Sequence, residues 1–92
     1  MISNFKCPDT ETMFSGTRVA RFVNIETVAM RKLAMLHRAA NLNDLRIPPN
    51  NRFEALKGDR KGQYSIRIND QWRVCFFFEN GNALDVEIVD YH

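Results

Sequence analysis

The chain has 92 residues, of which 45% are hydrophobic and 26% charged, a composition typical of one small globular domain spanning residues 1–92. No apolar stretch approaches the roughly 20 residues of a membrane-spanning helix, and polar residues interrupt the amino-terminal segment, so we expect a cytoplasmic protein with no membrane contact. The two cysteines and two histidines are too few and too far apart for a disulfide framework or a metal cluster, so the sequence predicts no metal and no cofactor.

Charge is unevenly distributed along the chain, although the net charge is only +2. Residues 46–73 carry seven lysines and arginines against three acidic residues, whereas residues 74–92 carry four acidic residues and neither lysine nor arginine. A basic segment followed by an acidic strand indicates either an anion-binding face with its own carboxylates or salt bridges across a sheet. Composition alone leaves both interpretations open.

The first half of the chain is predicted to contain one strand and two helices. Residues 1–7 favour a short strand, and Pro8-Asp9 starts a brief helix that ends at Ser15-Gly16. A longer helix is expected at residues 24–40, with Asn24 as its N-cap and a hydrophobic stripe at helical spacing. Residues 41–51, with four asparagines and two prolines, are predicted to form a loop.

The second half is predicted to form an antiparallel meander. Residues 63–69 and 72–79 both alternate between apolar and polar side chains, and both apolar sets face the core only if residues 69–71 form the loop. Arg67 then lies directly opposite Arg73. Because like charges at opposed positions destabilise a sheet, this register indicates a bound anion such as phosphate, unless each arginine pairs with an acidic neighbour.

The next hairpin is predicted to have a three-residue loop at residues 79–81, with Gly81 left-handed in a bulge. A two-residue turn would place the apolar residues of the last strand on the same face as Arg73, whereas the longer loop aligns Phe76 with Leu84. Glu87 would then face Arg73. Because the apolar face of the sheet needs a cover, we expect an α+β domain: a strand, two helices and a three-stranded antiparallel meander, with the helices packed on one face.

Several side chains from the basic segment and the carboxyl end suit metal-free RNA cleavage by transfer to the 2′-hydroxyl. This reaction needs a base, an acid and cations around the phosphorane. The residues that could supply charge or carry protons are Arg67, Arg73, Lys57, Asp90 and His92. Tyr91 could stack on an unpaired base. The alternative interpretation of Asp90-Tyr91-His92 is an ordinary frayed terminus.

Four segments carry a resemblance to a known family: Leu56-Lys57-Gly58-Asp59-Arg60, Tyr64-Ser65-Ile66-Arg67, Asn69-Asp70-Gln71-Trp72-Arg73 and Val86-Glu87-Ile88-Val89-Asp90-Tyr91-His92. Over essentially its whole length the chain resembles the HigB toxins of bacterial type II toxin–antitoxin systems, a branch of the RelE-like ribonucleases. The resemblance implies a RelE-like fold and ribosome-dependent cleavage of mRNA. It also implies a HigA-type helix-turn-helix antitoxin, so that DNA is contacted only through that partner.

The resemblance also implies roles for particular residues. The positions that match those used around the RNA in this family are Lys57, Arg73, Asp90, Tyr91 and His92. Glu54 stands where other members carry a histidine, which makes its carboxylate a candidate base. Arg60 and Arg67 are candidate phosphate contacts; Arg67 rests on the strand register more than on the family pattern and ranks below Arg73. Two alternatives remain open: a gyrase-inhibiting toxin of the related ParE type, and a non-catalytic RNA- or protein-binding module.

Overall fold

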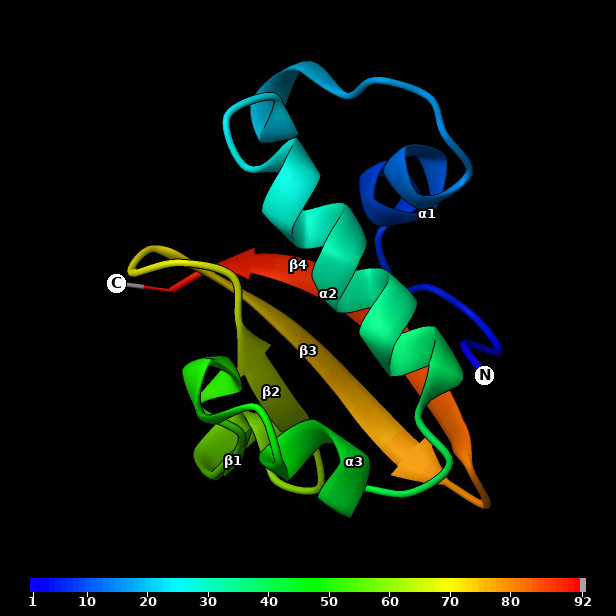
Figure 1. Cartoon of the computed structure of the whole chain (residues 1–92), viewed down its shortest axis with the longest axis vertical. Helices are drawn as coiled ribbons and strands as arrows, with labels where there is room; N and C mark the ends of the chain where they lie inside the picture. The colour runs from blue at the N-terminus through cyan, green and yellow to red at the C-terminus, as the bar shows by residue number, and fades with distance from the viewer. Residues whose placement is uncertain (92) are drawn as a thin grey trace.

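A four-stranded antiparallel sheet in the order β1-β2-β3-β4 forms the centre of the computed structural model, which describes residues 1–91 (Figure 1). The strands are β1 (Glu54–Ala55), β2 (Tyr64–Arg67), β3 (Trp72–Glu79) and β4 (Asn82–Asp90). The α-helices are α1 (Pro8–Phe14), α2 (Glu26–Arg38) and α3 (Asn43–Arg46), and the single-turn 3-10 helices are η1 (Ala20–Phe22), η2 (Pro49–Asn51) and η3 (Gly58–Arg60). The α+β architecture expected from the sequence is confirmed. Among the described residues, no helix is long and apolar enough to cross a lipid bilayer.

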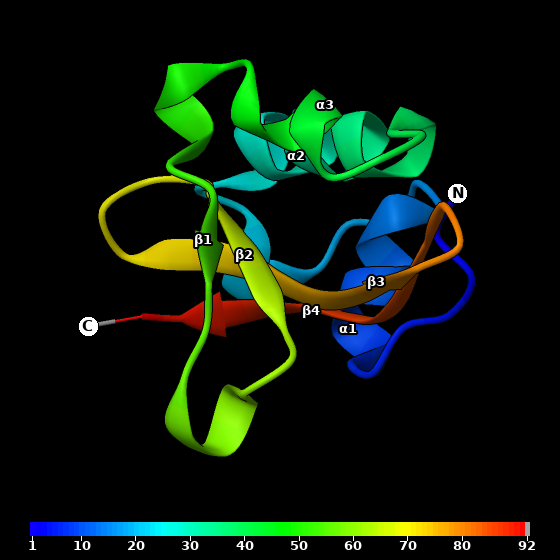
Figure 2. The ribbon, with the colours of Figure 1, turned by 90° about the horizontal axis from the view of Figure 1, so that it is seen from below.

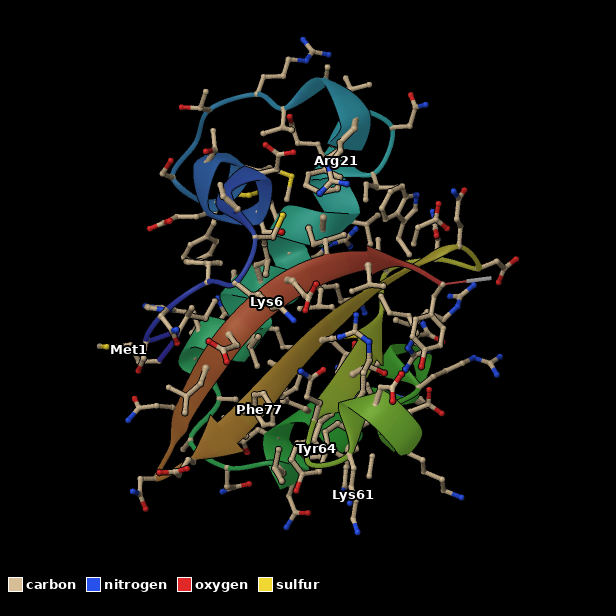
Figure 3. The ribbon with its side chains drawn as sticks, turned by 180° about the vertical axis from the view of Figure 1, so that it is seen from behind. Met1, Lys6, Arg21, Lys61, Tyr64 and Phe77 are labelled. Carbon is tan, nitrogen blue, oxygen red and sulfur yellow. The ribbon has the colours of Figure 1, made fainter. Side chains whose placement is uncertain are left out.

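The core lies between α2 and one face of the sheet, and Figure 2 shows α2 and α3 on the same side of the strands. Leu33 and Leu36 of α2 are completely buried, as are Val74 and Phe76 of β3. Burying one such side chain contributes about 1.5–3 kcal/mol to folding. The opposite face of β3 and β4 carries no helix (Figure 3). This uncovered face, called the open face below, is therefore available for a site.

The first hairpin of the meander has the predicted register. Tyr64 pairs with Phe76, and Arg67 pairs with Arg73. The amide groups of Ile68 and Asn69 both donate to the carbonyl of Trp72, which closes the loop. The prediction that the two arginine backbones face each other is confirmed.

The predicted register of the second hairpin is wrong. The turn has two residues, Asn80 and Gly81, with φ angles of 53° and 80°, because Glu79 pairs with Asn82. The extra residue lies inside β4 instead, as a bulge at Asp85, where φ is 51°. A bulge restores the alternation as well as a longer loop does, since either shifts the following residues by one position.

This bulge changes the partners expected along β4. Glu87 lies opposite Cys75, whereas Arg73 lies opposite Val89. Ala83 is buried in the core. Leu84 was predicted to face the core but is only partly buried. The predicted row of Arg67, Arg73 and Glu87 therefore does not form.

Three predictions for the first half of the chain also need correction. Residues 1–7 form two isolated parallel bridges to β4, at Ile2 and Phe5, in place of a regular strand. Helix α2 starts at Glu26 with Ile25 as its N-cap, so Asn24 does not cap it. The predicted loop at residues 41–51 contains α3 and η2.

Buried Asn51 explains why that segment folds although it is rich in asparagine and proline. Its amide group donates to the carbonyl of Leu45 at 3.1 Å, and its Oδ1 accepts a hydrogen bond from Nζ of Lys32. A buried amide that finds such partners can anchor a loop against a helix. The loop prediction is wrong because one of these partners, Lys32, lies outside the segment, in α2.

Candidate functional site

A row of polar side chains crosses all four strands on the open face. Glu54 lies opposite Ser65, Ser65 opposite Cys75, and Cys75 opposite Glu87. Directly opposed residues point to the same face of a sheet, and their neighbours along the strands occupy the core face. These four residues, called the polar row below, form the floor of the candidate site. Strand β1, which the sequence did not predict, contributes Glu54.

Two arginines make ion pairs with the two ends of the polar row. Nε of Arg73 donates to Oγ of Ser65 at 2.8 Å and lies 3.9 Å from a carboxylate oxygen of Glu54. Nη1 of Arg60 lies 3.3 Å from Oε2 of Glu87. Glu87 is largely buried, whereas about half of the Glu54 side chain is exposed, so the Glu54 end is open to an incoming ligand.

Cys75 lies at the centre of these four charges. Burial raises the pKa of its thiol to about 11, and Arg60, Glu87, Arg73 and Glu54 are all close enough to influence it electrostatically. The two guanidinium groups and the two carboxylates therefore surround one point of the sheet. Cys75 itself remains a neutral thiol near pH 7, so we assign it a packing role and not a nucleophilic one.

The guanidinium of Arg73 is fixed by the protein on two of its nitrogens. Besides the bond from Nε, Nη2 donates to the carbonyl of Arg52 at 2.5 Å and to that of Ser65 at 3.4 Å. Arg52 has a left-handed backbone with φ 43°. Nη1 has no hydrogen-bond acceptor among residues 1–91, so it offers two oriented donors to a ligand. A phosphate oxygen is the natural acceptor for such a group.

The end of β4 brings Tyr91 beside Arg73 and Asp90 beside the loop between β2 and β3. The Tyr91 ring lies 5.8 Å from the Arg73 guanidinium, and the Tyr91 amide donates to the carbonyl of Gln71 in the loop between β2 and β3. Oδ2 of Asp90 accepts a hydrogen bond from Nε2 of Gln71 at 3.1 Å. Tyr91 therefore lies beside Arg73, as predicted. Asp90 lies opposite Trp72, on the face of the sheet away from the polar row. His92 lies outside the described residues.

Arg67 does not share an anion site with Arg73 in this structure. Its guanidinium forms an ion pair with Asp70, and this hydrogen bond, together with the charge of Arg67, holds the pKa of the Asp70 carboxyl below its usual value. Arg67 also lines a pocket beside α2, whereas Arg73 lies against Ser65 and Glu54. Each arginine has an acidic partner, Asp70 for Arg67 and Glu54 for Arg73. This is the alternative arrangement that the sequence left open.

Ser65 belongs to the candidate site, whereas Lys57 makes no hydrogen bond or ion pair with the residues of the polar row. Lys57 precedes η3, is exposed and has no ion pair with any residue that the structure describes. Ser65 was missed by the sequence reasoning, although its alternation with Tyr64 and Ile66 already placed it on the polar face beside Arg73. In residues 1–91 no cluster of three or more histidine, cysteine, aspartate or glutamate side chains could hold a metal ion.

Comparison with known proteins identifies similar chains. Residues 14–92 match the model of the family described as HigB-like, RelE-like toxins of type II toxin–antitoxin systems. The chain is 41% identical over 87 residues to Toxin HigB-1 of Vibrio cholerae serotype O1, covering 92% of both proteins. It is 44% identical over 41 residues to Endoribonuclease HigB of Proteus vulgaris, covering 45% of each protein.

Proposed function

The chain belongs to the HigB-like family of RelE-like toxins of type II toxin–antitoxin systems, and from that premise we propose that it is an endoribonuclease that cleaves mRNA on the ribosome. The relative from Proteus vulgaris is itself named an endoribonuclease. The observation that carries the proposal is the fixed guanidinium of Arg73, whose Nη1 offers two hydrogen-bond donors beside the half-exposed carboxylate of Glu54. A phosphodiester placed there meets a cation and a proton acceptor together.

The reaction is transfer of the phosphoryl group to the neighbouring 2′-oxygen. A base removes the 2′-hydroxyl proton, the 2′-oxygen attacks phosphorus, and the bond from phosphorus to the 5′-oxygen breaks. The 5′-oxygen then takes a proton from an acid, which leaves a 2′,3′-cyclic phosphate and a 5′-hydroxyl. Arg73 stabilises the added negative charge of the phosphorane because its donors are already oriented before the charge develops.

The remaining residues have distinct roles in this scheme. Glu54 is the candidate base, and Asp90 and His92 are candidates for the acid that protonates the 5′-oxygen. Tyr91 offers an aromatic ring for stacking on a base next to the cleaved bond. Lys57 is free to contact a flanking phosphate.

Nη1 of Arg60 is already engaged, because Glu87 and Gln63 accept hydrogen bonds from it, so a phosphate would have to bind the other nitrogens of this guanidinium. Its observed partners therefore favour a different contribution. It offsets the charge of largely buried Glu87 and keeps the polar row electrically balanced.

A toxin of this family acts together with an antitoxin. We assign a HigA-type helix-turn-helix protein to that role here, with DNA contacted only through it, and place both proteins in the cytoplasm. The toxin's other partners in this scheme are the ribosome and its mRNA.

The proposal is tested by adding the purified toxin to ribosomes stalled on a defined mRNA and mapping the ends of the fragments. We expect cuts within the message only when ribosomes are present, with 5′-hydroxyl and cyclic phosphate ends. Fragments with 5′-phosphates would contradict the transfer mechanism. An intact message together with inhibited DNA supercoiling by gyrase would identify a ParE-type toxin, and an intact message with RNA binding alone would identify a binding module.

A further inference from the structure

A second cationic site lies outside the candidate site, in a pocket of about 460 Å³ beside α2. Its volume falls within the range of small-ligand sites. It is bounded by one face of α2, by the segment around η2 and by the end of β2. The lining residues are Val28, Arg31, Lys32, Met35, Pro48, Asn50, Arg67 and Ile68. Apolar side chains and three cations therefore line the same pocket.

The positive charge of this pocket is poorly neutralised. Within residues 1–91, neither Arg31 nor Lys32 has a carboxylate at ion-pair distance, and the partner of Arg67 is Asp70, whose side chain is 99% exposed. Nζ of Lys32 donates to the neutral amide oxygen of Asn51. Burial lowers the pKa of the Lys32 ammonium, and the charges of Arg31 and Arg67 lower it further. Three cations that repel one another at a concave surface favour the binding of an anion.

The pocket is adjacent to the candidate site through Arg67. The backbone of Arg67 lies directly opposite that of Arg73, and residues so paired are about 5 Å apart. The side chain of Arg73 faces the polar row, whereas that of Arg67 reaches the pocket. Figure 2 shows the loop between β2 and β3 and the carboxyl end of β4 at the same end of the molecule. A strand bound at Arg73 can therefore continue past this loop toward α2.

From this arrangement we infer that the pocket binds one nucleotide of the RNA strand flanking the cleaved bond. Arg31, Lys32 and Arg67 hold its phosphate, and its base or ribose packs on Val28 and Met35. This inference rests on the proposed function, because it extends the path of the same RNA. It gives Arg67 a phosphate contact separate from that of Arg73. An acidic peptide from a protein partner is the competing occupant, but the polyanion already assigned to the adjacent Arg73 site favours RNA.

The test compares two variants that each lose two positive charges. Arg31→Gln with Lys32→Gln removes the pocket cations, and Arg18→Gln with Arg38→Gln removes exposed cations elsewhere. The probe is a short single-stranded RNA with 2′-O-methyl riboses, which lacks the attacking hydroxyl. Its affinity is measured by fluorescence anisotropy at several salt concentrations. Urea denaturation shows that each variant is folded, and antitoxin binding is measured separately.

The pocket variant is expected to bind this RNA about tenfold more weakly than the control variant, with a salt slope smaller by about 0.7 for each phosphate that the protein no longer neutralises. Equal reductions in the two variants, or no RNA binding by the wild type, would overturn the inference. Unchanged RNA affinity with weakened antitoxin binding would also overturn it and would assign the pocket to an acidic peptide. If the wild type binds RNA through the pocket but cuts no message on ribosomes, the proposed function fails while the pocket assignment stands.

Discussion

Replacement of Arg73 tests the centre of the proposed mechanism, because this side chain combines a fixed orientation with unused donors. Arg73→Ala removes the group that faces the phosphorane. The loss of one preorganised donor group corresponds to about 2.7–4 kcal/mol of transition-state stabilisation, or a rate lower by about 10²–10³-fold. Arg73→Lys keeps the charge but cannot hold Ser65 and the Arg52 carbonyl while it also faces the ligand. We expect a rate reduction of about tenfold or more for the lysine variant, equivalent to about 1.4 kcal/mol.

The assay measures single-turnover cleavage of ribosome-bound mRNA with saturating toxin, so that binding and chemistry are separated. Arg38→Ala serves as the control because Arg38 is exposed at the end of α2. The free energy of unfolding is measured alongside, and it is expected to fall by about 1 kcal/mol for each hydrogen bond removed with Arg73. The reasoning is refuted if folded Arg73→Ala cleaves at the wild-type rate, since the fixed guanidinium would then be purely structural.

Four further predictions concern other residues. Ser65→Ala removes the acceptor that orients Nε of Arg73, so cleavage should slow by roughly tenfold with ribosome affinity unchanged; a full rate would show that the other bonds to Arg73 suffice. Burial raises the pKa of the Cys75 thiol from 9.0 to about 11. Between these pH values the folded state binds more protons than the unfolded state, so the free energy of unfolding should fall as pH rises. Urea titrations at several pH values measure this fall. Cys75→Ser should flatten this dependence relative to the wild type, and an unchanged slope would exclude Cys75 as its source. Asn80→Ala should destabilise the chain by about 1 kcal/mol while Asn80→Gly should not, because asparagine and glycine tolerate the left-handed backbone at this position and alanine does not; equal effects on urea denaturation would contradict this. Deleting His92 should abolish most cleavage while antitoxin binding persists. Full activity of the shortened chain would show that another residue acts as the acid.

The first hairpin could be predicted because two independent patterns agree on it. The apolar positions of both strands face one side only when Arg67 pairs with Arg73, and any slip by one residue exposes a whole apolar set. The second hairpin lacks this property. A longer loop and a bulge at Asp85 both restore the apolar face, and their energies depend on hydrogen bonds with Asn4, which is distant in the sequence. The predicted three-residue loop therefore placed Glu87 opposite Arg73, whereas in the structure it lies opposite Cys75.

The sequence indicated which residues belong to the candidate site better than it indicated how their side chains are arranged. Tyr91 lies beside Arg73, whereas Asp90 lies opposite Trp72 on the other face of the sheet. The direction of the Arg67 side chain was not predictable, because it depends on how far strand β1 extends along β2. Strand β1 pairs only with Tyr64 and Ser65, so no strand residue pairs with Arg67 on that side, and the side chain turns toward Asp70. Sequence alternation assigns a face of the sheet but does not reveal where a neighbouring strand stops.

The bridges between the amino-terminal segment and β4 bear on self-association of the toxin. Unpaired amides and carbonyls along an edge strand invite a second chain to add to the sheet. On β4 the backbone groups of Ala83 and Val86 are bonded to the segment 1–6, and the amide of Ile88 is bonded to Oγ1 of Thr10 in α1. The opposite edge, β1, is only two residues long. Within residues 1–91, neither edge offers a continuous template for strand addition, so edge-to-edge pairing of two toxin molecules is disfavoured.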